Sequence, residues 1–245
     1  MVIRVSGINV FFKGVGGEPD FSLEIPEIPF EIGEIVYLMG HNGSGKSVLL
    51  RTLTGEVQPR EGKLIFNIDN KFLPQSAVRP RLVRQQAEDC LALDLTVEEN
   101  LILRLQNTSL VDKLLPRKRL SSKAIEALDH GSILSEKLKQ TVRNLSGGQR
   151  QALAFLAVSL GKSNLLLLDE FLAATDEQTT HLLLEQVNNY CKNAPASVVI
   201  ASHDVDLAVR HADRILILRQ GRLIKDIDNS EKNSKPDYVR QFLTA

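Results

Sequence analysis

The sequence predicts an α/β fold: a mainly parallel sheet with an N-terminal antiparallel β layer and a helical subdomain. Three observations lead to this prediction. Residues 1–40 alternate apolar and polar side chains with the two-residue period of strands. Residues 86–145 are charged, leucine-rich and helical in spacing, and residues 165–228 alternate short apolar runs with helical stretches. Strands that alternate with helices form parallel sheets through right-handed crossovers.

The N-terminal β layer is predicted from two segments, IRVSGINVFF and FSLEIPEIPFEIGEIV. Glycine, proline and aspartate in GVGGEPD separate them, as is typical of a turn. The second segment leads into residues 35–39, an apolar run that suits a short buried strand.

The later elements follow from capping and period. Thr96, with Glu99 three residues on, forms a capping-box pattern that predicts a helix in LTVEENLILRLQ. The strand-then-helix pattern afterwards gives LLLLDE, a helix at about 176–191, the strand SVVIAS, the helix DVDLAVRHA and the strands RILILR and RLIKD. We expect one domain with a catalytic core and an insertion. The predicted parts are core 1–85 and 146–228, helical subdomain 86–145, and linker plus C-terminal helix 229–245.

Composition excludes several classes of protein. The chain has 245 residues, enough for a substantial core. Thirty basic residues balance thirty acidic ones, so we expect no nucleic-acid partner. No apolar run approaches the ~20 residues that cross a bilayer, and the N-terminus MVIRVSG lacks the apolar core of a signal peptide. We therefore expect a soluble cytoplasmic chain. Cys90 and Cys191 lack metal-site spacing, which favours buried or idle thiols.

The glycine-rich segment GHNGSGKS joins the predicted strand 35–39 to a predicted helix. In this context the spacing is the P-loop pattern, in which backbone N–H groups and a helix N-terminus wrap phosphate oxygens. Lys46 is expected to reach the β and γ phosphates, and the Ser47 hydroxyl to hold Mg²⁺. The alternative is a plain glycine turn with a solvated lysine. The predicted nucleotide-binding residues here are Gly40, His41, Asn42, Gly43, Ser44, Gly45, Lys46, Ser47 and Val48.

Two adjacent carboxylates, Asp169 and Glu170, end the apolar run LLLLDE. Ligands of parallel sheets bind at the carboxyl ends of the strands. Phosphoryl transfer needs Mg²⁺ beside the phosphates and a group that positions the attacking water. We predict that Asp169 supports the metal through its water shell and that Glu170 acts as general base. The alternative is a strand that ends in solvated acids.

The third motif lies in NLSGGQRQALAFLAVSL and comprises Leu145, Ser146, Gly147, Gly148 and Gln149. Two glycines are poor helix formers, so their presence at the start of a helical run favours exposed backbone N–H groups there. This pattern predicts a second anion site. An ordinary helix cap formed by Ser146 is the alternative.

With these motifs in this order, the sequence resembles the nucleotide-binding subunit of an ATP-binding-cassette (ABC) transporter. LSGGQ is that family's signature motif, GHNGSGKS its Walker A motif and LLLLDE its Walker B motif. The resemblance runs from about residue 2 to residue 225. It implies a P-loop NTPase fold, ATPase activity, and ATP and Mg²⁺ as cofactors.

The resemblance also implies roles for residues outside the three motifs. Gln85, in LVRQQ, corresponds to the glutamine loop that senses Mg²⁺ and the γ-phosphate, and is thus a catalytic and metal-site residue. His203, in IASHD, corresponds to the catalytic switch histidine. Asp176, in AATD, belongs to the D-loop, although it could equally cap a helix. Phe12 or Phe11 takes the place where adenine stacks, with a core role as the alternative.

Four positions depart from the family pattern. Phe171 stands where proline usually follows the Walker B glutamate, and Thr175 replaces the usual D-loop leucine. Arg84 replaces a common aromatic residue, and Gln86 offers another register for the glutamine loop. No catalytic side chain of the pattern is missing, so we expect a competent ATPase.

The partners follow from the resemblance. The signature motif would serve the nucleotide of a second ABC subunit, a copy or a paralogue, in a head-to-tail dimer with two ATP molecules. Transport would need separate transmembrane permease subunits, and a substrate-binding protein is a further candidate partner. The chain would then lie on the inner face of the cell membrane, with Leu91 and Leu93 near the Gln85 loop as candidate contacts.

Three other functions share parts of this motif pattern. A non-transport cassette ATPase, such as an iron-sulfur assembly factor, stays open. A GTPase or nucleotide kinase is disfavoured, because NKFL at 70–73 lacks the aspartate of a guanine-specificity motif and LSGGQ would have no role. A regulatory binder without hydrolysis is disfavoured by the intact Glu170. The sequence does not reveal the transported substrate or the direction of transport.

Overall fold

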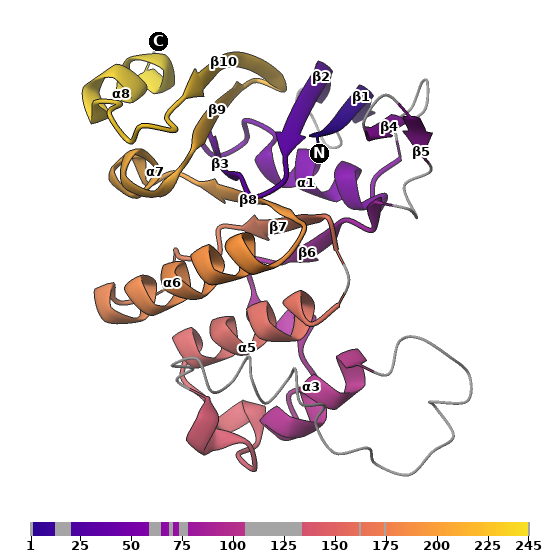
Figure 1. The fold of residues 1–245 in the computed structure, drawn as a ribbon, viewed down its shortest axis with the longest axis vertical. Helices are drawn as coiled ribbons and strands as arrows, with labels where there is room; N and C mark the ends of the chain where they lie inside the picture. Colours follow the sequence, from indigo (N-terminus) through magenta and orange to yellow (C-terminus); the bar gives the residue numbers. More distant parts are fainter. Residues whose placement is uncertain are drawn as a thin grey trace. The chain divides into compact units, whose positions relative to one another are not determined.

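The computed structural model describes residues 2–12, 21–58, 65–68, 71–73, 78–105, 134–161, 163–173 and 175–244. The chain divides into two compact units (Figure 1). The first unit comprises Met1–Leu82, Ser163–Glu170 and Asn188–Ala245, and the second comprises Val83–Lys162 and Phe171–Val187. This division assigns the LSGGQ helix to the second unit, whereas the sequence boundaries at 86 and 145 put it in the core. The sequence boundaries stay a prediction.

The described strands form one sheet in the order β5-β4-β1-β2-β10-β9-β3-β8-β7-β6. In its central part β3 pairs in parallel with β8 and β9, and β7 pairs in parallel with β8. On the N-terminal side β1, β2, β4 and β5 pair antiparallel. The predicted α/β fold with an antiparallel β layer is therefore confirmed. The bounds are β1 Val2–Phe12, β2 Phe21–Glu31, β3 Ile35–Met39, β4 Ile65–Ile68, β5 Lys71–Leu73, β6 Arg81–Val83, β7 Leu165–Asp169, β8 Ser197–Ser202, β9 Arg214–Arg219 and β10 Arg222–Asp228.

The helix that begins at Val97 has the side-chain cap that its sequence predicts. The predicted capping box is present before α3, because Thr96 N donates to Glu99 Oε2 at 2.9 Å and Glu99 N donates to Thr96 Oγ1 at 3.2 Å. The strand-and-helix alternation expected after residue 165 is also confirmed. The α-helices are α1 Lys46–Thr54, α3 Val97–Leu105, α5 Gly147–Ser159, α6 Glu177–Asn193, α7 Val205–His211 and α8 Pro236–Thr244, and the short 3-10 helices are η1 Ala87–Cys90, η2 Ser135–Lys137 and η3 Val142–Asn144.

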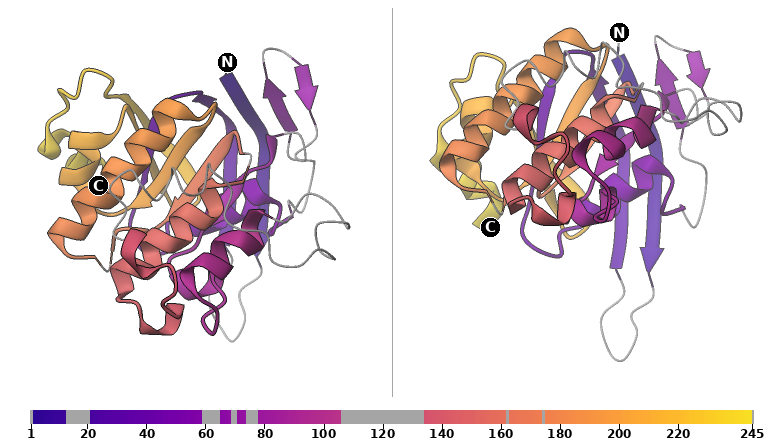
Figure 2. Two further views of the ribbon diagram at one scale, coloured as in Figure 1. Left: turned by 60° about the horizontal axis from the view of Figure 1, so that its bottom comes forward. Right: turned by 90° about the horizontal axis from the view of Figure 1, so that it is seen from below.

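The long strands β1 and β2 run side by side (Figure 2). Ile3 and Val5 are buried before Gly7, and Ile8 and Val10 are buried after it, so the buried positions change from odd to even. Gly7 has a φ of 76°, a left-handed conformation that glycine adopts without steric penalty. All four apolar residues therefore reach one hydrophobic core.

That core also fixes the position of the glycine-rich loop. Val36 and Leu38 of β3 and Leu49, Leu50 and Leu53 of α1 belong to the same cluster. Both ends of the loop are thus anchored by buried apolar side chains, so the chain between residues 40 and 45 is held between a fixed strand and a fixed helix.

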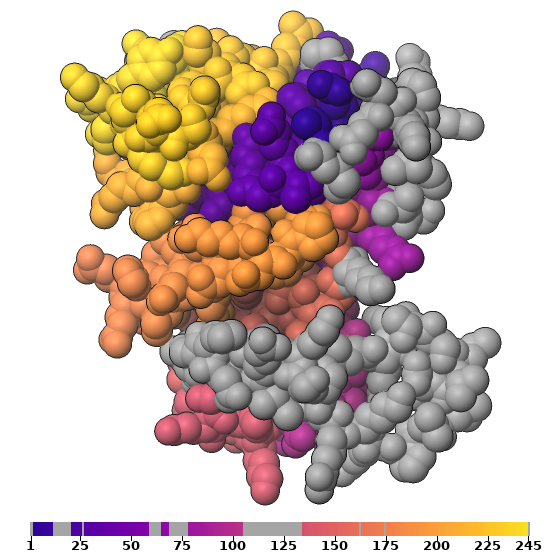
Figure 3. All heavy atoms as spheres, viewed as in Figure 1, coloured from indigo at the N-terminus to yellow at the C-terminus, as the bar shows by residue number. Residues whose placement is uncertain are grey.

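The segment after β10 is held in place by hydrogen bonds to the end of α7. Asn229 is buried, and its Nδ2 donates to Val209 O at 3.0 Å and Ala212 O at 2.8 Å. The predicted C-terminal helix α8 follows, and Arg240 of α8 donates to Asp206 of α7 at 2.8 Å. Residues of α8 form part of the exposed surface, yellow in Figure 3.

The two cysteines are buried and free, as predicted. Burial raises the pKa of the Cys191 thiol to about 11. In the part of the chain that the structure describes, no group of three or more His, Cys, Asp and Glu residues is arranged to hold a metal ion. Among the described helices, none has the length and apolar character needed to cross a membrane.

Candidate functional site

Three parallel strands of the first unit end at one edge of the sheet. Met39 of β3 lies opposite Ser202 of β8, and Asp169 of β7 lies opposite Ala201. The chain therefore leaves these strands at the same level. The residues that follow the three strands are Gly40, Glu170 and His203.

The glycine-rich loop presents a bare helix N-terminus. Gly45 precedes α1 with a φ of 105° and offers no side-chain cap. The first N–H groups of a helix have no intrahelical acceptor, so those of α1 are available to an anion. A Cβ on Gly45 would lie 2.8 Å from Phe21 Cζ, and one on Gly40 would lie 2.3 Å from Leu218 O. Packing against a backbone carbonyl therefore requires glycine at position 40, and the left-handed backbone favours glycine at position 45.

Lys46 is buried inside this loop, with only 6% of its side chain exposed. Its Nζ donates to Gly40 O at 2.7 Å and lies 3.5 Å from Glu170 Oε1. A buried ammonium needs such partners, because desolvation without them is strongly unfavourable. Phosphate oxygens carry more charge than a carbonyl, so a phosphate at the loop would compete effectively for the same donor.

Ser47 and Asp169 meet beside the lysine. Ser47 Oγ donates to Asp169 Oδ1 at 3.1 Å, and Asp169 is buried. Burial raises the pKa of Asp169 above its usual value, and the Ser47 hydrogen bond partly opposes this shift. Hydroxyl and carboxylate oxygens are ligands that suit Mg²⁺, and a cation would relieve the unfavourable burial of the carboxylate. The two side chains therefore fit the predicted metal.

Glu170 is held between two cationic or donor side chains. Its Oε1 faces Lys46, and its Oε2 lies 2.9 Å from His203 Nδ1. Glu170 also has a φ of 46°, which is uncommon for a residue with a Cβ and is typical of functional sites under local strain. The side chain of Glu170 is mostly buried (12% exposed), whereas that of His203 is 66% exposed. The carboxylate is fixed, and the imidazole is open to a ligand.

The signature motif lies in the second unit and caps its own helix. Ser146 Oγ accepts from Gln149 N at 3.3 Å, and Gln149 Oε1 accepts from Ser146 N at 3.1 Å. The alternative that Ser146 is a helix cap is therefore observed, and Leu145 before it is buried. The cap uses the N–H of Gln149. It does not use the N–H groups of Gly147 and Gly148, which lie at the N-terminal end of α5 and can donate to a ligand.

Gln85 and Asp176 also lie in the second unit. Gln151, buried in α5, donates from Nε2 to Gln85 O at 2.8 Å and so fixes the backbone of the predicted glutamine loop. Asp176 Oδ1 accepts from Thr179 N at 2.9 Å, which is the helix-cap role that the sequence left open. Phe11 and Phe12 lie in β1, but the Phe12 side chain falls outside the described residues.

Two departures from the family pattern have local structural roles. Thr175 Oγ1 donates to Leu172 O at 2.9 Å and lies 2.7 Å from Thr180 Oγ1. Phe171 is fully buried, with its ring centroid 5.8 Å from that of Phe155. Both residues therefore stabilise the second unit.

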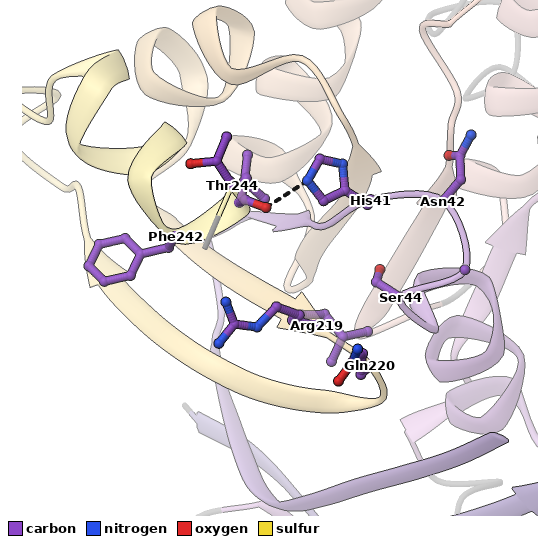
Figure 4. Close-up of a pocket in the computed structure, with 10 residues that line it drawn as sticks. His41, Asn42, Ser44, Arg219, Gln220, Phe242 and Thr244 are labelled. Atoms are coloured by element: carbon purple, nitrogen blue, oxygen red, sulfur yellow. Dashed lines mark hydrogen bonds between the residues drawn. The ribbon is translucent and has the colours of Figure 1, made fainter.

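Sequence reasoning missed a contact between the loop and the C-terminal helix. His41 Nε2 lies 2.6 Å from Leu243 O, near the end of α8 (Figure 4). A carbonyl oxygen only accepts, so Nε2 of His41 carries the proton. A cavity of about 340 Å³ adjoins this contact. Its lining residues are His41, Asn42, Gly43, Ser44, Leu218, Arg219, Gln220, Phe242, Leu243 and Thr244.

A parallel sheet whose glycine-rich loop, buried lysine and strand-end carboxylates meet at one edge defines a P-loop nucleoside triphosphatase. Residues 23–173 match the family model described as ABC transporter. The chain is 30% identical over 240 residues to the tyrosine transport ATP-binding protein of Clostridioides difficile, covering 95% of this chain and 94% of that one. It is 32% identical over 232 residues to the phosphonates import ATP-binding protein PhnC 3 of Nostoc sp., covering 92% and 86%.

The fold has solved counterparts. A dimeric ATP-binding cassette in a post-hydrolysis state, bound to ADP and Pi, superposes with a TM-score of 0.73 at 25% identity, covering 93% of this chain and 98% of that one. The chain belongs to the ABC transporter family, as the sequence resemblance implied. It is an ATPase subunit of a transporter, and the relatives do not favour the iron-sulfur assembly alternative.

Proposed function

We propose that this chain binds ATP with Mg²⁺ at the P-loop, hydrolyses it at an interface with a second cassette, and drives transport through separate transmembrane subunits. One observation carries the proposal. Lys46, Glu170 and His203 form a connected set at the edge where β3, β7 and β8 end.

The connected set supports a sequence of steps. The γ-phosphate draws the ammonium of Lys46 away from Gly40 O and from Glu170, because phosphate oxygens are stronger acceptors. Glu170 Oε1 is then free to accept a proton from the attacking water. The water oxygen bonds to the γ-phosphorus, and the bond to the bridging oxygen of ADP breaks. His203 holds the other carboxylate oxygen and so keeps Glu170 oriented.

The metal site of the proposal comprises Ser47 and Asp169, with Gln85 in the role that the family resemblance implies. A bound Mg²⁺ supplies charge neutralisation at the β and γ phosphate oxygens. Ser47 and Asp169 orient the site through their 3.1 Å hydrogen bond before any ligand arrives. Phe12 keeps its proposed role of stacking on adenine.

A second subunit completes the site. The P-loop surrounds a triphosphate from one side, and charge on the γ-phosphate oxygens is best stabilised by donors from the other side as well. The N–H groups of Gly147 and Gly148, which the cap of α5 does not use, are suited to that task together with Ser146. The dimeric relative with ADP and Pi supports this arrangement. The motifs are complete, so they permit a dimer of two copies of this chain, and a paralogue is the alternative.

The membrane partners are proposed to be permease subunits that dock near the Gln85 loop. Leu91 and Leu93 are partly exposed there and offer apolar contacts. The chain then lies on the inner face of the membrane. Relatives named for phosphonate and sulfonate import support import, with a substrate-binding protein as a further partner. Isolation of this chain from native membranes, with identification of the proteins that accompany it, tests this part.

Replacement of Glu170 by glutamine tests the hydrolytic mechanism. Glu170→Gln keeps the size of the side chain but removes the base, so turnover should fall at least about 100-fold. ATP binding should persist, and an ATP-bound dimer should accumulate on size-exclusion chromatography. Glu231→Gln, the same change at an exposed position, is the control. Normal turnover in a monomeric Glu170→Gln variant would refute the base assignment.

A further inference from the structure

Within the second unit, the first turns of α5 and α6 meet at a glycine. A Cβ on Gly148 would lie 2.6 Å from Cγ2 of Thr179, a distance that two non-bonded carbon atoms do not adopt. A Cβ on the neighbouring Gly147 would have no atom within 4 Å. Packing inside the unit therefore requires a glycine at position 148 and not at position 147.

Thr179 is also hydrogen-bonded to the D-loop. Its backbone N donates to Asp176 Oδ1 at 2.9 Å, and its hydroxyl donates to Asp176 Oδ2 at 2.8 Å. These bonds lower the pKa of Asp176, so the ionised carboxylate is the form they favour. A β-branched side chain in a helix is stiff at χ1, so the methyl contact and the hydroxyl bond constrain one rotamer.

A second tether strengthens this arrangement. Thr175, where the family usually has leucine, joins its hydroxyl to that of Thr180 at 2.7 Å and donates to Leu172 O. Thr175 and Asp176 of the D-loop are thus each hydrogen-bonded to a residue in the first turn of α6. This tether distinguishes the chain from the usual family pattern.

We propose that Thr179 is a positioning residue that holds the D-loop carboxylate of Asp176 at a fixed place relative to the signature glycines. The inference rests on the proposed function, because it concerns two segments assigned there to the partner's nucleotide. A partner site then meets Asp176 and the tip of α5 as one rigid piece. Loss of the link lowers turnover and leaves the affinity of the P-loop for ATP unchanged, because the P-loop belongs to the first unit.

A suppressor experiment tests the packing half of the inference. Gly148→Ala in the full chain should lower turnover by up to about 100-fold, the scale of a 1 Å misplacement, and should lower the melting temperature. Thr179→Ser removes Cγ2 and keeps the hydroxyl, and the remaining contacts of the alanine would be 3.3 Å to Oγ1 and 3.4 Å to Cβ. The double variant should regain both turnover and melting temperature.

Gly147→Ala is the matched control for the melting temperature, because its added Cβ would have no atom within 4 Å, and Thr179→Ser should not change that melting temperature. If Gly148→Ala is equally impaired with threonine and with serine at 179, the glycine requirement comes from elsewhere and the inference falls. The melting temperature reports on the packing even if the chain hydrolyses nothing. A failure of the proposed function, shown by ATP affinity that is insensitive to Lys46→Ala, is therefore distinguishable.

The proposed positioning role of Thr179 is tested by removing its hydroxyl group. Thr179→Val keeps the branched shape of the side chain and removes the hydroxyl bond to Asp176 Oδ2, while the backbone N–H bond to Asp176 Oδ1 remains. Thr179→Ser keeps both bonds and removes the methyl group. We expect Thr179→Val to lower kcat about tenfold, the lower end of the range for one lost hydrogen bond to a charged group, with the KM for ATP within about twofold of the parent. Thr179→Ser should stay close to the parent. Equal kcat values for Thr179→Val and the parent would overturn the positioning role.

Discussion

Glycines lie at the N-terminal ends of both α1 and α5, Gly45 just before α1 and Gly147 as the first residue of α5, yet the two ends are built in opposite ways. The tip of α1 has Gly45 in a left-handed conformation, no side-chain cap, and the buried Lys46 beside it. The tip of α5 has Ser146 in an extended conformation and a reciprocal cap with Gln149. A tip that binds its own ligand can stay bare, because strand and core hold it. A tip proposed for a partner's ligand is stable before that ligand arrives.

The largest expected effect is on ATP affinity and comes from a substitution at the uncapped N-terminus of α1. Lys46→Ala should weaken ATP binding by about 10- to 150-fold, the range for hydrogen bonds to charged groups. It removes the ammonium that Gly40 O and Glu170 now share. Titration with a fluorescent ATP analogue measures the change, with the exposed Lys192→Ala as control. Unchanged affinity would remove the P-loop assignment.

The next effect compares the glycines of the two tips. Gly45→Ala should destabilise the protein by about 1–3 kcal/mol, because alanine is strained at a φ of 105° and its Cβ would meet Phe21. Gly147→Ala has open space and should change stability by less than about 1 kcal/mol. Thermal unfolding of the two variants decides. Equal losses at both positions would contradict the difference between the tips.

The capped tip should respond to loss of its cap. Ser146→Ala removes the acceptor for Gln149 N and should reduce stability by about 1 kcal/mol. Ser146→Thr keeps an acceptor and serves as the control. The midpoint of urea unfolding measures both. A midpoint for Ser146→Ala equal to that of the parent would show that the cap does not stabilise α5.

The smallest expected effect is on the stability of the protein at low pH. Hydrogen bonds from the Thr179 backbone and then its side chain lower the pKa of Asp176 below its usual value. Its stabilisation is thus present above the unfolded pKa and is lost as pH falls through the folded pKa. Asp176→Asn should be less stable than the parent at about pH 6, and the gap should close towards about pH 2. A gap that stays constant over this range would contradict the assignment.

The sequence predicted the parts of the fold and site that have a local signature. The five-residue strand ending at Asp169 and the loop around Lys46 carry their period and spacing in consecutive residues, so strand, loop and helix were predictable. The contact of His41 with Leu243 was not, because it joins residues 202 positions apart and has no motif. Nor was the left-handed φ of Glu170, because backbone strain is imposed by the surrounding packing.

Ser146 shows a different kind of limit. A serine before two glycines fits an anion site and a helix cap equally well, since both uses draw on the same hydroxyl. Coordinates were needed to show that its oxygen accepts from Gln149 N. The Thr179 contact with Gly148 was also hidden, because it depends on how α5 and α6 approach each other.

The contact between α8 and His41 affects where a label can be attached to this protein. An affinity tag or fluorescent fusion added behind residue 245 would emerge next to the glycine-rich loop, since Leu243 touches that loop directly. Such an addition would disturb nucleotide titrations even when the enzyme is otherwise intact.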